Sequence, residues 1–303
     1  MNITIHQRQA LLGSALVILG AIGFSTKSIL IKLAYADSAP VDAITLMALR
    51  MLMALPFFLA VALSGREPRQ TAHNGLDWSV LVLLGLLGYY MASFLDFSGL
   101  QYISAGLERL ILFLYPTIVV LLTALLYRRP IGKAQGAALL LSYAGIALVY
   151  AHSPHQTSPH FHLGAALVFG SALTFAVFMV GSGHYIPRFG ARRFTAYSMT
   201  IACLATIIHF AVERPLADLL VSQRVFYLAA LLAVFSTVLP SFLVSAGIKR
   251  IGADNASIVG TVGPVATLGM AYFILGETLS GYQLAGSALV LAGVTVVSIA
   301  KRG

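Results

Sequence analysis

Charged residues are scarce in this sequence of 303 residues, making up only 10% of the total, whereas hydrophobic residues make up 59%. A soluble globular domain has about 25% charged and about 45–50% apolar residues. The 19 Lys and Arg and the 10 Asp and Glu are too few to cover a water-facing surface. The composition therefore excludes an ordinary soluble enzyme and a disordered protein.

Cysteine is nearly absent as well. The one cysteine, Cys203, lies in an apolar run, so the chain cannot form an intrachain disulfide and is not a secreted disulfide scaffold. The sequence also offers no Ser/His/Asp grouping and no nucleotide-binding loop, which counts against an enzyme.

Long apolar runs are what the sequence does contain. A helix needs roughly 20 apolar residues to cross a hydrocarbon core of about 30 Å. Cutting the chain where charge, Pro and Gly cluster gives ten runs, at 10–32, 41–63, 76–97, 103–126, 134–151, 163–186, 193–212, 223–247, 253–275 and 281–300. They are continuous rather than alternating, which favours helices over barrel strands, and the first is too long for a signal-peptide core. The sequence predicts an all-α integral membrane protein with ten transmembrane helices.

Lys and Arg are unevenly distributed between the two sides of these spans. With a cytoplasmic N-terminus, the outer loops hold only Lys32, Arg214 and Arg224. The inner loops and ends hold Arg8, Arg66, Arg69, Arg128, Arg129, Lys133, Arg188, Arg192, Arg193, Lys249, Arg250, Lys301 and Arg302. Because positive residues concentrate on cytoplasmic loops, both termini are predicted to be cytoplasmic. The same bias explains the pI of about 9.8 without a nucleic-acid partner.

The sequence repeats itself. A shift of 148 residues aligns 83–149 with 231–297 and places Pro116 on Pro264, and a shift of 151 aligns the start of the first span with that of the sixth. Each copy holds five helices, and because five is odd the copies cross the membrane in opposite directions. We therefore expect two inverted five-helix repeats, at 1–152 and 163–303, joined by an outer loop at 153–162. This architecture is typical of secondary transporters; the alternative is simple duplication in a membrane enzyme or scaffold.

Pro116 and Pro264 lie near the middle of the fourth and ninth spans. Each lacks an amide hydrogen, and its ring opposes the carbonyl four residues earlier. Exposed carbonyls are tolerated in lipid only inside protein or facing a wet cavity. Pro116 and the stretch from Gly260 to Pro264 are therefore candidates for lining a substrate cavity, and the alternative is a packing kink with no ligand contact.

Five charged residues fall inside the spans, where each is costly and hence a functional candidate: Lys27, Arg50, Asp96, Glu108 and Arg109. Arg50 is the deepest, roughly 14 Å from the outer end of its span. The other four align with neutral residues of the second copy, namely Phe178, Val244, Ala256 and Ser257. If these charges served only folding, both copies would be expected to need them.

Three positive and two negative side chains leave this cluster with a net charge of +1, which suits a metabolite bearing a carboxylate. Arg50 is the expected anchor, because a guanidinium donates two parallel hydrogen bonds to a carboxylate, and Lys27 is a second binding candidate. Asp96 and Glu108 are candidates for carrying a coupled proton, because burial disfavours a charged carboxylate. The alternative is a set of internal ion pairs, with Lys27, Arg109 and Lys32 reaching the headgroups.

Two further groups of side chains are ambiguous. Tyr90 and Phe94, with Tyr89 and Phe97, place aromatic rings on the third span, which suits either packing or a wall for the solute. The outer loop contains His152, His155, His160 and His162. Such a tract can bind a metal, but its spacing matches no zinc pattern, so we interpret it as a solvated linker and predict no metal site.

Several motifs carry a family resemblance: Gly23-Phe24-Ser25 before Ile31-Lys32-Leu33-Ala34, the stretch Ala43 to Arg50, the two copies Ala105 to Pro116 and Ala253 to Pro264, and Leu275-Gly276-Glu277-Thr278-Leu279-Ser280. In this order they resemble the EamA branch of the drug/metabolite transporter superfamily over essentially the whole chain. The resemblance implies a multi-pass exporter or exchanger of solutes in the cytoplasmic membrane. The first copy has Arg128-Arg129-Pro130 in place of the Gly-Glu loop, which limits the expected role of Glu277 to capping or topology.

These observations lead to one main hypothesis, a secondary-active transporter for a small polar metabolite such as an amino acid or organic anion, working by alternating access. The alternatives are an integral membrane enzyme and a metal carrier that uses the histidine loop. The expected partners are a small-molecule solute and the lipid bilayer, with no cofactor. Gly132 and Gly136 have the spacing of close helix packing, and the protein is expected to be a monomer or homodimer.

Overall fold

The computed structural model describes residues 5–39, 41–64, 74–128, 130–152, 159–260 and 262–300, and these residues form helices and no strand. The α-helices are α1 (Ile5–Tyr35), α2 (Ala43–Leu63), α3 (Gly75–Gly85), α4 (Ala92–Leu100), α5 (Ala105–Leu112), α6 (Tyr115–Tyr127), α7 (Lys133–Ala151), α8 (Phe161–Phe189), α9 (Ala191–Glu213), α10 (Gln223–Ala233), α11 (Leu239–Val259), α12 (Val262–Leu275) and α13 (Gly281–Ala300). Two π-helical segments, η1 (Leu86–Met91) and η3 (Val234–Val238), and one 3-10 turn, η2 (Leu216–Leu219), complete the set.

These elements account for the predicted spans. Seven helical runs are long and apolar enough to cross a membrane, and three shorter apolar helices, at 135–151, 262–275 and 281–296, supply the rest. The third span is built from α3, η1 and α4, the fourth from α5 and α6, and the eighth from α10, η3 and α11 as far as Ile248. The prediction of an all-α, ten-helix membrane protein is therefore confirmed.

Short polar side chains mark where several spans begin. Asp42 accepts a hydrogen bond from the Thr45 amide at the start of α2, and Ser104 does the same for Leu107 in α5. The first amides of a helix have no partner within the helix, so a side-chain oxygen at this position stabilises it by roughly 1 kcal/mol. Asp42 and Ser104 thus fix the starts of α2 and α5.

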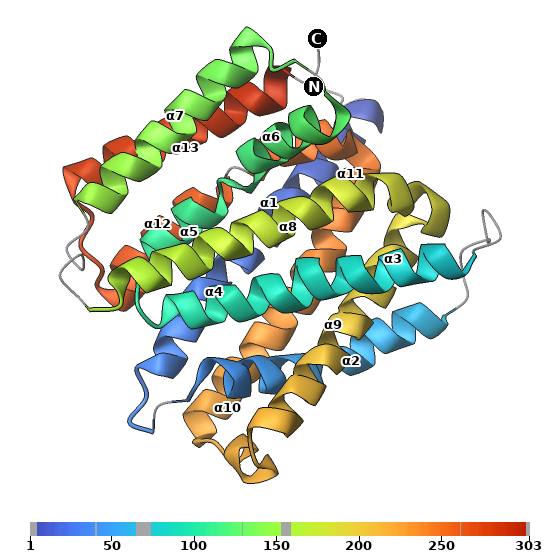
Figure 1. Ribbon diagram of the computed structural model, residues 1–303, viewed down its shortest axis with the longest axis vertical. Coiled ribbons are helices and arrows are strands. Elements are labelled where there is room, and N and C mark those ends of the chain that lie inside the picture. Colours follow the sequence, from blue (N-terminus) through green and yellow to red (C-terminus); the bar gives the residue numbers. More distant parts are fainter. Residues whose placement is uncertain are drawn as a thin grey trace.

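The helices pair mainly between the two halves of the chain. Extensive packing joins α1 to α11, α2 to α9, α4 to α8 and α7 to α13. Figure 1 shows α7 and α13 side by side at one edge of the molecule. Every one of these pairs takes one helix from each predicted repeat, so neither half forms a bundle on its own.

Equivalent contacts recur in the two halves. A Cβ added to Gly99 would lie 2.5 Å from Cγ2 of Val168, and a Cβ added to Gly247 would lie 2.5 Å from Cγ2 of Val17. These pairs are related by the same sequence shifts that define the repeat, and so are the two π-helical segments, which begin at Leu86 and Val234. The structure therefore repeats the packing as well as the sequence.

The junction of the eighth and ninth spans differs from the prediction. Helical backbone continues through 248–252, where we expected a break, and α11 ends only at Val259. Arg250 lies beside Gly13, whereas Gly263 lies beside Ala21, so the chain reverses direction between these two points. Pro264 determines where the new helix starts, because a residue that lacks an amide donor is tolerated only in the first turn of α12.

Replacing the interface glycines tests this packing. Gly99→Ala and Gly247→Ala would place a Cβ 2.8 Å from the Gly164 carbonyl and 2.9 Å from the Gly13 carbonyl. Because backbone cannot move aside easily, each change is expected to cost about 1–3 kcal/mol and to lower the unfolding temperature in detergent. Gly183→Ala, where nothing lies within 4 Å, is the control and should leave it unchanged or raise it. Equal unfolding temperatures for all three would contradict the proposed contact.

Candidate functional site

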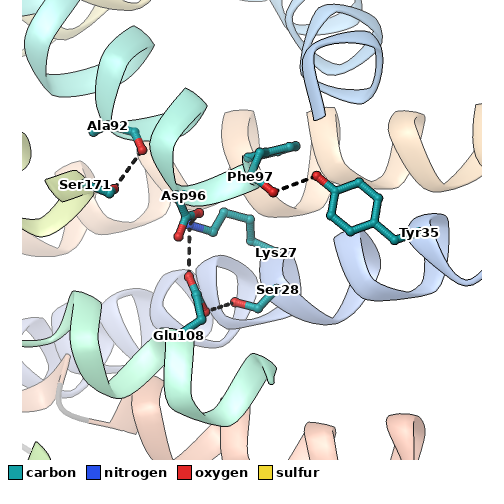
Figure 2. A network of polar contacts seen from close by, with 8 residues as sticks. All are labelled: Lys27, Ser28, Tyr35, Ala92, Asp96, Phe97, Glu108 and Ser171. Atoms are coloured by element: carbon teal, nitrogen blue, oxygen red, sulfur yellow. Dashed lines mark hydrogen bonds and ion pairs between the residues drawn. The ribbon is translucent and has the colours of Figure 1, made fainter. Parts of the chain in front are cut away.

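Three charged side chains meet between α1, α4 and α5 (Figure 2). The Lys27 Nζ lies 2.5 Å from Asp96 Oδ2 and 3.6 Å from Glu108 Oε1. Asp96 is 1% and Glu108 0% exposed, so both carboxylates are cut off from bulk water. The Lys27 ammonium turns inward to both carboxylates, and its role in binding a solute stays a prediction.

Local structure fixes the position of Glu108. The side chain belongs to the first turn of α5, where the helix dipole favours a negative charge. Ser28 of α1 donates a hydrogen bond of 2.6 Å to Glu108 Oε2. The carboxylate is thus held from two sides, by its own helix and by α1.

Sequence reasoning missed the serines and threonine around Lys27. Ser25 donates to the Gly263 carbonyl at 2.7 Å, and the hydroxyls of Thr26 and Ser236 lie 2.7 Å apart. Four consecutive polar residues, 25–28, within an apolar span were the available signal. Through them α1 reaches both the broken ninth span and the π-helical segment η3 of the second half.

Arg50 has a different environment. Its side chain is only 4% exposed, and its guanidinium lies over the Phe97 ring, 4.5 Å from the ring centroid. A ring face attracts a cation, but it does not accept hydrogen bonds from the N–H groups of the guanidinium that point away from the ring. Arg50 Nε and Nη2 have no hydrogen-bond partner among the described residues. A buried donor without a partner is costly, so this residue calls for an explanation beyond folding.

Spare hydrogen-bonding capacity is a shared property of these charges. Asp96 Oδ1, Glu108 Oε1 and Arg109 Nε are also buried without a hydrogen bond within the described part of the chain. Lys27 keeps 18% of its side chain accessible although it lies between three helices. The group therefore offers unused donors and unused acceptors beside a partly accessible ammonium, which suits a polar ligand or a proton.

The structure breaks the fourth span beside Pro116. Helix α5 ends at Leu112 and α6 begins at Tyr115, with Pro116 in its first turn. Thr117 donates its hydroxyl and its amide to the Leu114 carbonyl. The Leu114 carbonyl at the break therefore has hydrogen-bond partners within the protein.

The ninth span has its break at the aligned position. Gly260 follows the end of α11, and Pro264 is buried in the first turn of α12. A Cβ at Gly263 would lie 2.9 Å from Arg109 Nη2, so the irregular stretch lies against α5. Its role in substrate binding stays a prediction.

Tyr90 and Phe94 form a separate cluster around His209 of α9. The Tyr90 hydroxyl lies 2.9 Å from His209 Nδ1, and the Phe94 ring centroid lies 5.0 Å from that of the imidazole. Glu213 Oε1 is 3.1 Å from His209 Nε2. Because residues two apart on a helix point about 200° away from each other, Phe94 faces away from Asp96. The structure does not bring these rings to the Lys27 group.

The histidine loop shows no metal-binding arrangement where it is described. His152 stacks on Tyr282 with centroids 3.8 Å apart, and His162 pairs with Tyr150. His155 lies outside the described residues. Within those residues there is no group of three or more side chains able to hold a metal ion. Nothing described thus favours the metal-carrier alternative.

Comparison with known proteins identifies the family. The model of the EamA-like transporter family matches residues 11–151 and again 162–299. The chain belongs to the EamA-like transporter family. It is 31% identical over 300 residues to a protein of Bacillus subtilis strain 168 described as the uncharacterized transporter YcbK, covering 97% of this chain and 95% of YcbK. An uncharacterized transporter of Archaeoglobus fulgidus is 27% identical over 286 residues, or 94% of this chain and 95% of that protein.

A solved structure has the same fold. The crystal structure of another protein superposes on this EamA chain with a TM-score of 0.64 at 18% sequence identity. The match covers 96% of this chain and 97% of the other. With the family match, the chain is a multi-pass membrane transporter. The family and its relatives point away from the enzyme alternative.

Removing one member of the ion-pair group tests its balance. Lys27→Met leaves two buried carboxylates facing each other, whereas Asp96→Asn leaves the ammonium paired with Glu108. Breaking a buried ion pair costs about 3–5 kcal/mol, so Lys27→Met should lower the unfolding temperature of the purified protein more than Asp96→Asn. The double variant Lys27→Met/Asp96→Asn should recover part of the loss. Equal effects of the single variants would show that the pairing does not govern stability.

Proposed function

We propose that this protein is a secondary-active transporter that exports or exchanges a small polar metabolite, such as an amino acid or organic anion, across the cytoplasmic membrane. It works by alternating access between two inverted units, 1–152 and 163–303, joined by the loop 153–162, with both termini in the cytoplasm. The observation that carries this proposal is the buried group of charges with unused hydrogen-bonding capacity. The group lies where α1 contacts the second half of the chain.

Arg50 is the proposed anchor for the anionic group of the solute. Lys27 is already bound by two carboxylates, whereas Arg50 Nε and Nη2 have no acceptor among the residues that the structure describes. A carboxylate accepting both would restore the hydrogen bonds that the buried guanidinium lacks. Lys27 contributes by holding Asp96 and Glu108 in place and by contacting the solute with its accessible part.

Glu108 is the better placed of the two proton candidates. Asp96 is bound to Lys27 at 2.5 Å, whereas Glu108 approaches the same nitrogen only to 3.6 Å. Protonation of Glu108 would leave a neutral acid that keeps its hydrogen bond from Ser28 and no longer attracts Lys27. The resulting change in the net charge of Lys27, Asp96 and Glu108 couples the proton to an anionic solute.

The irregular segments supply the places where the units bend. Breaks in the fourth and ninth spans and π-helical segments in the third and eighth occur at aligned positions. Segments of this kind are common at functional sites and kinks. The stretch from Gly260 to Pro264, together with Pro116, is therefore proposed to line and reshape the path of the solute. The proposed partners are the solute and the lipid bilayer, and the proposed assembly is a monomer or homodimer.

Substitution of Arg50 tests the anchor. In proteoliposomes assayed with a panel of metabolites, Arg50→Met should raise the half-saturating concentration of solutes bearing a carboxylate roughly 10- to 100-fold, since hydrogen bonds to charged groups contribute about 1.5–3 kcal/mol. Arg50→Lys should recover part of this, and neutral solutes should be unaffected. Arg224→Met, which removes an exposed guanidinium that pairs with Asp37, is the matched control. Unchanged uptake of every solute by Arg50→Met would refute the anchor.

A second experiment tests proton coupling. An imposed pH gradient should accelerate uptake by the wild-type protein, and a protonophore that collapses the gradient should remove the acceleration. Glu108→Gln should still exchange solute at equal pH but respond no longer to the gradient, because the amide cannot lose a proton. Asp96→Asn should keep the response. If the wild-type protein ignores the gradient, proton coupling is wrong, and if Glu108→Gln still responds, Glu108 is not the carrier.

A further inference from the structure

The loop before α13 is joined to the outer end of the fourth span by one side chain. Glu277 Oε1 accepts a hydrogen bond of 2.7 Å from the Ala105 amide, and Glu277 Oε2 accepts one of 3.1 Å from the Gly106 amide. These are the first two amides of α5, which have no partner within the helix. The expected capping role of Glu277 is thus present, and the helix it caps belongs to the other half of the chain.

Helix α5 is a short unit with a break behind it. It contains eight residues and is separated from α6 by the turn at Phe113 and Leu114. The same eight residues carry Glu108 and Arg109. Whatever holds the first turn of α5 therefore also holds Glu108 against Lys27 and Ser28.

The two halves of the fourth span share α7 and α8 as neighbours but otherwise pack against different helices. Helix α5 packs on α1, α4, α7, α8 and α12, whereas α6 packs on α7, α8 and α13. Ala105 is fully buried in a cluster with Ile29 of α1 and Ala271 of α12. On the predicted topology the first turn of α5, which carries Glu108, lies toward the outer end of the fourth span.

We propose that Glu277 is a positioning residue that latches α5 in the closed position and so controls access from outside to Lys27, Asp96 and Glu108. The inference rests on the proposed alternating access. When the two hydrogen bonds break, α5 swings at the turn behind Leu112 and carries Glu108 away from α1. The outer loop of the second unit thereby sets the position of a proton-carrying group in the first.

The aligned position of the first copy carries no acceptor for such a latch. The residue aligned with Glu277 is Arg129, and an arginine side chain has no hydrogen-bond acceptor. A latch on one side only favours the state that is closed to the outside. Loss of one charge-assisted hydrogen bond should shift the ratio of closed to open protein roughly 10-fold or more.

Cysteine labelling from outside tests the latch without knowledge of the solute. Ala105→Cys is placed in a Cys203→Ser background, and intact cells are treated with a membrane-impermeant maleimide. The cysteine should react slowly when Glu277 is intact and roughly 10-fold faster with Glu277→Gln, which keeps only one acceptor oxygen. Glu213→Gln is the control, because that outer glutamate contacts His209 and not α5, and it should leave the rate unchanged.

Hydrogen exchange of the chain without engineered cysteine gives an independent measurement. Amides in peptides covering 104–112 should exchange faster with Glu277→Gln, while the buried native Cys203 stays unreactive in detergent, which separates opening from unfolding. Equal labelling and equal exchange with and without the glutamate would overturn the latch, as would faster exchange accompanied by a reactive Cys203. Faster labelling in a protein that moves no metabolite would support the latch and refute the proposed transport.

Discussion

A charge buried in a membrane protein has to be compensated by the protein, and this constraint organises the first half of the molecule. Lys27 satisfies it with Asp96 of α4 and Glu108 of α5, so three spans are fixed around one ammonium group. The compensation reaches further, because Glu108 also takes the hydroxyl of Ser28 and belongs to the first turn of α5. A helix too short to be stable alone is thereby held at both its polar end and its charged face.

The two repeats share their packing but not their chemistry. The π-helical segments η1 and η3 begin at aligned residues. Segment η3 places Ser236 against the hydroxyl of Thr26. In η1, by contrast, Gly88 packs against the ring of Phe178, which is the residue aligned with Lys27. An aromatic ring thus fills one side of the pseudo-symmetric structure where an ammonium and its partners occupy the other. Duplication supplied the scaffold, and divergence at a few positions placed the polar site in one half.

Sequence was a good guide to what the bilayer constrains and a poor guide to what tertiary contacts decide. Span lengths and positions followed from hydrophobicity, because a helix in lipid has to be apolar over a set length. The intramembrane charges stood out because they are rare. Their pairing did not, since nothing along the chain says that Lys27 meets Asp96 and Glu108 while Arg50 rests on Phe97. The π-helical segments and the helical continuation of α11 to Val259 also had no local signal, because neighbouring helices determine them.

Transport requires that some contacts hold while others exchange, and the structure separates the two kinds. Between α7 and α13, a Cβ at Gly145 would lie 2.5 Å from the Gly286 carbonyl, so these helices are in close backbone contact and leave no room for rearrangement. The charged group is the opposite case, because Asp96, Glu108 and Arg50 each keep a polar atom without a hydrogen bond in the described residues. An ionic network in which every polar atom is hydrogen-bonded is rigid. A network with unused donors and acceptors can adopt other hydrogen-bonded arrangements of similar energy. On the proposed function, this unused bonding capacity lets the site release one arrangement and adopt another when a solute or a proton arrives.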